Sequence, residues 1–127
     1  MPEKKTLERA RKAKREGKAP TTQAGAFVHE EIEHVRKGKH GARSTKQAIA
    51  IGLSKARRAG VKLSPPKKGT VSARTRKQAQ RDLSRAKSGR KASPSRSRAT
   101  RRALKREGRS AASRSALLRQ ARTARRK

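Results

Sequence analysis

Strong core-forming side chains are so few in this sequence that only a small part of it can form a packed unit. Leucine, isoleucine, valine and phenylalanine together make up 15 of the 127 residues. A chain with less than about 20 % of these residues and a high net charge rarely buries enough apolar surface to offset its conformational entropy. Alanine is abundant, but it favours helix and adds little to a core. We therefore expect a mostly α-helical protein whose folded part is small.

The charges and the apolar residues are distributed unevenly along the chain. Residues 1–63 hold ten of the 15 strong apolar residues and a net charge of +11, whereas residues 64–127 carry +21 of the total of +32. The two regions meet at Ser64–Gly69, where paired prolines favour extended backbone and exclude helix. This pattern predicts a small helical head (1–63), a Pro-rich linker (64–69) and a basic tail rich in Arg, Ala and Ser (70–127).

Several classes of protein are excluded by what the sequence lacks. It contains no cysteine, which excludes disulfides, thiolate nucleophiles and cysteine-based zinc sites. The longest apolar run, Ala48–Leu53, is six residues long, too short for a membrane span or the apolar part of a signal peptide. We expect a cytoplasmic protein whose high positive charge calls for a polyanionic partner, with no membrane insertion.

Two helices are expected in the first part of the head. The first should span about Thr6–Glu16, with Thr6 as its N-cap, and the second about Thr22–Lys37, with Gly38 as its end. The second helix has a stripe of apolar residues at helical spacing, namely Ala24, Phe27, Val28, Ile32 and Val35. Glu31 projects into that stripe, so it needs a basic partner, for which Arg43 or a residue of the next helix is a candidate.

A third helix is expected between Ser44 and Gly60. Ser44-x-x-Gln47 matches a capping box, and Gly60 followed by Val61 matches a glycine-terminated helix end with an apolar contact back to Ala56. Small residues at four-residue spacing favour close packing against the second helix, so that Ile49 and Leu53 contact Phe27, Val28 or Ile32. The second and third helices together predict a small helical hairpin over about residues 22–61, preceded by a basic helix.

This third block also carries a resemblance to known proteins. Residues 41–60 read GARSTKQAIAIGLSKARRAG and resemble the core of a family of short basic bacterial proteins of unknown function. The resemblance covers roughly residues 1–70 and implies a bacterial origin but no activity. The tail resembles, in composition only, bacterial proteins with linker-histone-like basic tails.

The tail is helix-prone but poor in apolar residues. Three segments, Val71–Lys87, Ser97–Glu107 and Ser110–Arg126, have the composition of basic helices, with Gly89 and Gly108 between them. Charge repulsion opposes compaction of such a chain, so we expect the free tail to be largely disordered and to form helices on a polyanion.

The composition favours double-stranded over single-stranded nucleic acid. The one aromatic residue, Phe27, is assigned to the core, whereas recognition of single strands uses several exposed aromatic rings. Arginine outnumbers lysine 16 to 7 in residues 64–127, and arginine suits bidentate phosphate contacts and the minor groove. Ser64-Pro65-Pro66-Lys67 and Ser93-Pro94-Ser95-Arg96 resemble histone-tail elements that favour A·T minor grooves, although this composition also produces such strings by chance.

Signals of catalysis or metal binding are weak. The histidines in His29-Glu30-Glu31-Ile32-Glu33-His34 are five residues apart, which breaks the zinc spacing His-Glu-x-x-His. Glu31-x-x-His34 matches only half of a carboxylate-bridged dimetal motif. We expect Glu30–His34 and His29–Glu33 to be solvated ion pairs one helical turn apart, and we predict no enzyme activity, no cofactor and no metal.

The leading hypothesis is a non-enzymatic, nucleoid-associated or linker-histone-like protein that binds duplex DNA without strong sequence preference. Two alternatives remain open, namely a protein-interaction or self-association module in the 22–61 hairpin that the tail tethers to nucleic acid, and a protein associated with structured RNA or the ribosome. The expected nucleic-acid-binding residues are the basic side chains of the third helix, the linker and the tail: Arg43, Lys46, Lys55, Arg57, Arg58, Lys67, Lys68, Arg74, Arg76, Lys77, Arg81, Arg85, Arg96, Arg98, Arg101, Arg102, Arg119, Arg122, Arg125 and Arg126.

Overall fold

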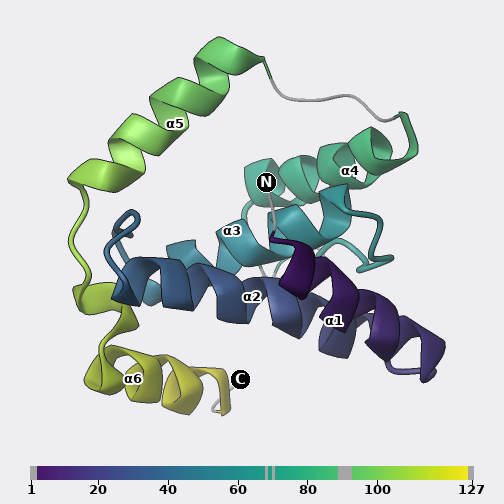
Figure 1. Ribbon diagram of the computed structural model, residues 1–127, viewed down its shortest axis with the longest axis horizontal. Coiled ribbons are helices and arrows are strands. Elements are labelled where there is room, and N and C mark those ends of the chain that lie inside the picture. Colours follow the sequence, from purple (N-terminus) through teal and green to yellow (C-terminus); the bar gives the residue numbers. More distant parts are fainter. Residues whose placement is uncertain (1–2, 68, 70, 89–92, 126–127) are drawn as a thin grey trace. The chain divides into compact units, whose positions relative to one another are not determined.

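The regular elements of the protein are helices in the part of the chain that its computed structural model describes, residues 3–67, 69, 71–88 and 93–125 (Figure 1). The elements are α1 (Lys4–Arg15), α2 (Pro20–Arg36), α3 (Thr45–Arg58), α4 (Ala73–Ser88), α5 (Pro94–Arg106), a short 3₁₀ helix (Ser110–Ala112) and α6 (Arg114–Arg125). The predicted fold class is confirmed. None of the described helices is both long enough and apolar enough to cross a membrane.

Two glycines end α2 and α3 as the sequence predicts. Gly38 and Gly60 have φ angles of 76° and 104°, a backbone region that glycine adopts without strain. At both sites the glycine amide donates to the carbonyl three residues earlier, and the next amide donates to the carbonyl five residues earlier. This double hydrogen bond satisfies carbonyl groups that the helix end would leave unpaired. After Gly60, Val61 packs in the same apolar cluster as Ala56, as predicted.

The starts of the helices differ in detail from the predictions. Helix α1 begins at Lys4, so Thr6 lies inside the helix and is buried rather than acting as its N-cap. Burial of Thr6 and Ala10, one turn apart on the same face, outweighs the capping preference of threonine. At the start of α3, the Ser44 hydroxyl accepts from the Gln47 amide as predicted, but the Gln47 side chain accepts from the Arg43 amide instead of that of Ser44.

The chain divides into two compact units. Unit 1 consists of Met1–Phe27 and Gly52–Lys91, and unit 2 consists of Val28–Ile51 and Ala92–Lys127. Each unit therefore contains residues from both sides of the expected linker at 64–69.

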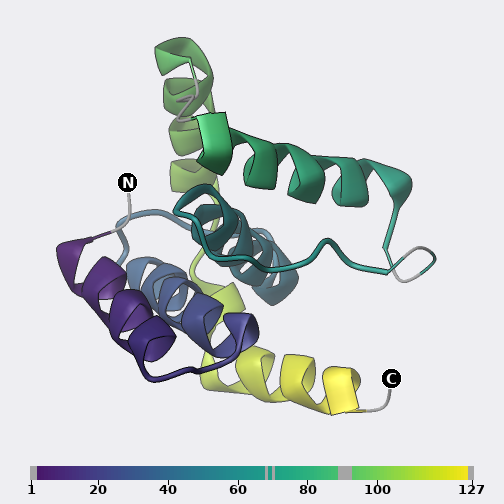
Figure 2. The same cartoon turned by 90° about the vertical axis from the view of Figure 1, so that its right-hand side faces the viewer.

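Unit 1 has a core built around Phe27, which is fully buried. The first half of α2 and the second half of α3 contribute to it, and Figures 1 and 2 both show α1 alongside the former and α4 alongside the latter. The residues of this cluster are Ala10, Ala24, Phe27, Ala56 and Val61, with Leu7, Leu53 and Leu63 packed against it. Leu53 thus joins the cluster of Phe27, as the sequence predicts.

Unit 2 has a separate core centred on Val35. Ile32 and Val35 of α2 pack with Ala48 of α3, and the cluster is completed by Ala42, Ala111 and Ala112. Within unit 1 the first half of α2 packs with the second half of α3, and within unit 2 the second half of α2 packs with the first half of α3, as expected for the predicted hairpin. Ala111 and Ala112 come from the segment that the sequence assigns to the tail, so that segment contributes to the core of this unit.

The three helix-prone segments of the tail form α4, α5 and α6. Each helix is preceded by a serine whose hydroxyl accepts a hydrogen bond from the backbone amide three residues later. These serines are Ser72 for α4, Ser93 for α5 and Ser113 for α6. These caps satisfy amides that lack a partner within the helix. These serines of the tail therefore stabilise the starts of its helices.

Candidate nucleic-acid interface

The basic residues expected on α3 do not share one environment. Arg43 and Lys46, at the start of the helix, are exposed, and Lys55 is half-buried. Arg58 is also exposed, and its Nε lies 3.6 Å from Oδ1 of Asp82 in α4. Asp82 is fully buried, so the partly exposed Arg58 places a positive charge beside a carboxylate inside unit 1.

Arg57, one of the expected nucleic-acid-binding residues, is buried and has a structural role. Its side chain is 6 % exposed. Its Nε donates to the Leu63 carbonyl at 3.2 Å, and its Nη2 donates to the Ser64 carbonyl at 3.1 Å. Burial lowers the pKa of Arg57, and the charge of Asp82 raises it in part. The guanidinium therefore fixes the chain after α3 instead of facing a phosphate.

Helix α4 carries several exposed basic residues and a buried carboxylate, Asp82. Arg74, Lys77 and Arg81 are exposed, and Arg85 is half-buried. Arg76 is half-buried too, and its Nε donates to the Pro66 carbonyl at 2.9 Å. Ser64 and Pro66 thus both supply carbonyl groups to buried or half-buried arginines, which gives the first Ser-Pro segment a defined contact within unit 1.

Helix α5 is the most exposed helix of the described chain. None of its residues is buried. It contains no acidic residue and six basic ones, which are Arg96, Arg98, Arg101, Arg102, Lys105 and Arg106. The second Ser-Pro motif starts this helix, with Ser93 as the N-cap and Pro94 in its first turn. Four expected binding residues, Arg96, Arg98, Arg101 and Arg102, therefore lie on one exposed helix.

The remaining expected residues lie on α6, in the linker or outside the described part of the chain. Arg119 and Arg122 are exposed on α6, and Lys67 is exposed after the prolines. Lys68 and Arg126 lie outside the described residues, and the side chain of Arg125 is not described.

Comparison with known proteins identifies a family but no function. A model of a family of unknown function (DUF6496) matches residues 4–68. The chain belongs to this family. No curated protein matches the chain, and no solved structure matches it either. The match confirms the resemblance to a family of unknown function that the sequence suggests.

The DUF6496 region includes a basic helix that the sequence reasoning did not assign to the interface. Helix α1 carries seven lysines and arginines, and all of them are exposed. At 100° per residue, however, Glu8 and Glu16 fall within the same arc as these cations. Glu16 also lies 4.0 Å from Lys12. The carboxylates partly neutralise this face.

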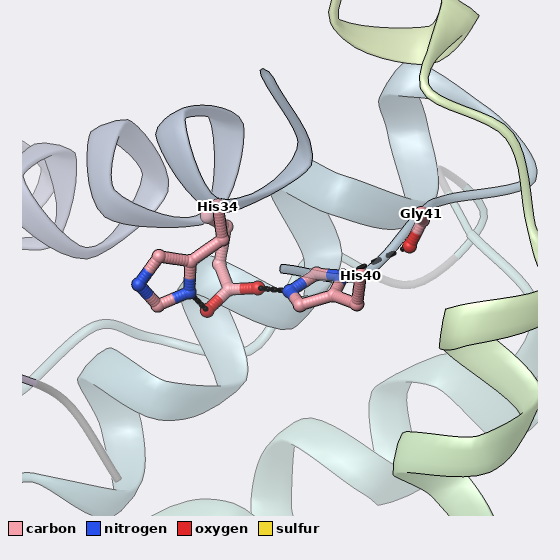
Figure 3. A network of polar contacts seen from close by, with 4 residues as sticks. His34, His40 and Gly41 are labelled. Atoms are coloured by element: carbon pink, nitrogen blue, oxygen red, sulfur yellow. Dashed lines mark hydrogen bonds and ion pairs between the residues drawn. The ribbon is translucent and has the colours of Figure 1, made fainter. Parts of the chain in front are cut away.

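The same region contains a cluster of one carboxylate and two imidazoles. Glu31, which is 1 % exposed, has Oε1 at 3.7 Å from Nδ1 of His34 and Oε2 at 3.1 Å from Nε2 of His40. Figure 3 shows both rings directed at this carboxylate. The suggestion of Arg43 as the partner of Glu31 is wrong, because histidines occupy that position. The expectation of a solvated Glu30 is also wrong, because Glu30 is buried.

His40 is the member of this cluster that the sequence reasoning missed. It lies outside α2, two residues after Gly38, and the positive φ angle of that glycine turns the chain back over the last helical turn. His29 and His34 are related by the spacing of α2, but this spacing does not apply to His40, which follows the end of the helix. The sequence feature that could have identified His40 is its position just after a glycine predicted to end a helix.

Proposed function

We propose that this chain is a non-enzymatic nucleic-acid-binding protein of nucleoid-associated or linker-histone-like type. Its partner would be duplex DNA, bound through phosphate contacts with little sequence preference. The observation that carries the proposal is the exposed, acid-free basic face of α5, supported by the formal net charge of +32.

The geometry of α5 suits a row of phosphates. At 100° per residue, five of its six cations fall within an arc of about 140°, and they extend over about 12 Å along the helix axis. The residues of this face are Arg98, Arg101, Arg102, Lys105 and Arg106. A helix with its side chains is about as wide as the major groove of B-DNA, and arginine donates to phosphate oxygens in a bidentate manner. Such contacts position the protein on the duplex without reading its sequence.

The environment of the single aromatic residue supports double-stranded over single-stranded partners. Phe27 is fully buried in the core of unit 1, so its ring is not available to stack on an unpaired base. The exposed surface therefore offers charge and hydrogen-bond donors, which suit a duplex backbone.

The test compares two sets of three arginines on the full chain. Arg98, Arg101 and Arg102 of α5 are replaced by Gln in one variant, and the exposed Arg9, Arg11 and Arg15 of α1 are replaced by Gln in the control. Both variants lose three charges, and Gln has nearly the same helix propensity as Arg. Binding to a duplex of mixed sequence is measured by fluorescence anisotropy across a range of salt concentrations.

We expect the α5 variant to flatten the slope of log affinity against log salt by about 2–3, since each lost phosphate contact removes about 0.9. In the control variant the slope should flatten by about 1 or less, because Glu8 and Glu16 already offset part of the charge of α1. An equal or larger loss in the control would move the interface to α1.

Competition between the same duplex and a structured RNA of equal length tests the nature of the polyanion. We expect the DNA to compete for binding to the protein at least as well as the RNA. A clear preference for RNA would contradict the assignment of DNA and favour an RNA-associated role, since A-form helices differ from B-DNA in groove shape and in their 2′-hydroxyl groups.

A further inference from the structure

The cluster of Glu31, His34 and His40 has the composition of a transition-metal site. One ligand atom from each residue can be chosen so that all three lie within 4.8 Å of one another. The two imidazole rings are 5.8 Å apart between centroids and are nearly perpendicular, with an interplanar angle of 83°. The carboxylate is almost completely buried, and both histidine side chains are 13 % exposed. The ligand atoms therefore converge in a place that is shielded from water but not closed.

The hydrogen bonds of His40 give an independent indication of a cation. Its Nδ1 lies 2.9 Å from the carbonyl oxygen of Gly41, which only accepts, so this nitrogen carries the proton. Its Nε2 lies 3.1 Å from the Glu31 carboxylate. A bare Nε2 would direct a lone pair at a negatively charged oxygen, so this nitrogen carries either a second proton that donates to the carboxylate or a metal ion.

The bond from His40 to Gly41 is also the arrangement that metal-binding histidines commonly have. A ligating histidine usually donates its other ring N–H to a carbonyl or a carboxylate, which fixes the tautomer and the direction of the ring. Here the Gly41 carbonyl plays that part, and Figure 3 shows His40 between Gly41 and the carboxylate.

We propose that Glu31, His34 and His40 bind a divalent first-row transition-metal ion, with Zn²⁺ as the best fit. Zinc takes imidazole nitrogens and carboxylate oxygens at about 2.0–2.2 Å, so neighbouring ligand atoms in a tetrahedral site lie about 3.4 Å apart. The nitrogen–oxygen separations of 3.7 Å to Oε1 and 3.1 Å to Oε2 lie on either side of this value but end on different oxygens, so Glu31 would bind the ion through both oxygens or rotate slightly. Two nitrogen ligands disfavour Mg²⁺ and Ca²⁺, which prefer oxygen.

The ion would fasten the turn after α2 to the helix itself. Glu31 and His34 belong to the last two turns of α2, whereas His40 follows Gly38. The next residue, Gly41, donates its amide to the Leu104 carbonyl at the end of α5, 2.7 Å away. Metal binding would thus stabilise the segment of unit 2 on which α5 is anchored. This inference does not depend on the proposed DNA binding.

The experiment uses the full chain, freed of nucleic acid at high salt and of metal by a chelator. Zn²⁺ is titrated by calorimetry, and Mg²⁺ serves as the comparison ion. His34→Gln and His40→Gln each remove one ligand, whereas His29→Gln removes the exposed histidine of α2 and is the matched control. Far-UV circular dichroism verifies that each variant retains its helix content, and Co²⁺ absorption reports the coordination geometry.

We expect one Zn²⁺ per chain, no heat from Mg²⁺, and a Tm raised by about 5–10 °C in excess zinc. Each ligand variant that keeps its helix content should bind zinc at least about tenfold more weakly, and His29→Gln should bind it as the original chain does. Absence of saturable binding to the original chain would overturn the proposal and leave His40 as a protonated partner of Glu31. An equal loss with His29→Gln would also overturn it, since it would indicate binding to surface histidines in general.

Discussion

Arg57 and Arg58 are neighbours in sequence but differ in environment, and this difference can be measured. The Arg57 side chain is buried and donates to two backbone carbonyls, whereas the Arg58 side chain is 41 % exposed and has one carboxylate 3.6 Å away. We expect Arg57→Gln to destabilise unit 1 and to leave phosphate binding nearly unchanged. Arg58→Gln should destabilise unit 1 less than Arg57→Gln does and should weaken phosphate binding more.

The magnitude for Arg57 follows from its two hydrogen bonds. A hydrogen bond that involves a charged group contributes about 1.5–3 kcal/mol, and the cost of burying the guanidinium offsets part of the sum. The free energy of unfolding should therefore fall by about 2–4 kcal/mol in Arg57→Gln. For Arg58→Gln we expect a smaller loss of about 1–2 kcal/mol, because the guanidinium is partly exposed to solvent but its partner Asp82 is fully buried.

Urea denaturation followed by far-UV circular dichroism measures the loss of stability, and the salt dependence of DNA binding is measured on the same samples. Arg58→Gln should flatten the salt slope by at most about 0.9, the value of one phosphate contact. If Arg57→Gln kept the urea midpoint of the original chain and lost one unit of salt slope, Arg57 would be a phosphate ligand. The structural role assigned to it would then be wrong.

Two further predictions concern packing within the units. Phe27→Ala should lower the free energy of unfolding by about 3–5 kcal/mol, because Phe27 is fully buried, whereas Leu118→Ala should change it by less than about 0.5 kcal/mol, because Leu118 is 55 % exposed. Thermal denaturation of both variants checks this contrast, and similar melting curves would contradict it. Gly41→Ala should cost about 1–3 kcal/mol, because a Cβ at this position would collide with the backbone carbonyl of Glu107. Faster hydrogen exchange at the Gly41 and Ala42 amides would locate the damage, and unchanged exchange there would refute this account.

The elements that the sequence predicts well are those that local signals define. The ends of α2 and α3 follow from Gly38 and Gly60, because a residue that tolerates positive φ angles is needed where a helix closes with this pattern of bonds. The apolar stripe of α2 predicts Phe27 and Val35 as core residues, and both are fully buried. Thr6 was misassigned because its capping preference competes with burial, which spacing alone does not reveal.

The contribution of the tail to unit 2 could not be predicted in this way. Ala111 and Ala112 are two of many alanines, and nothing in their neighbourhood marks them as core residues. The Thr45 hydroxyl donates to the Ala111 carbonyl, and the Arg36 guanidinium donates to that of Ala112. Carbonyl groups belong to every residue, so the sequence carries no sign of such bonds. A deletion of residues 64–127 would remove these contacts and is therefore not a clean test of the tail's charge.

The exposed cations of the interface were the easier part to predict, and the convergence of the histidines was the harder part. Arg98, Arg101 and Arg102 are exposed because a basic, leucine-poor helix has little to bury, so composition nearly suffices. The site of Glu31 and His40 depends instead on a reversal of the chain direction at Gly38. Helical spacing does not place residues beyond that glycine, but the glycine itself predicts the reversal. The residues just after a glycine stop should therefore be tested against the last two turns of the helix whenever ligating side chains are sought.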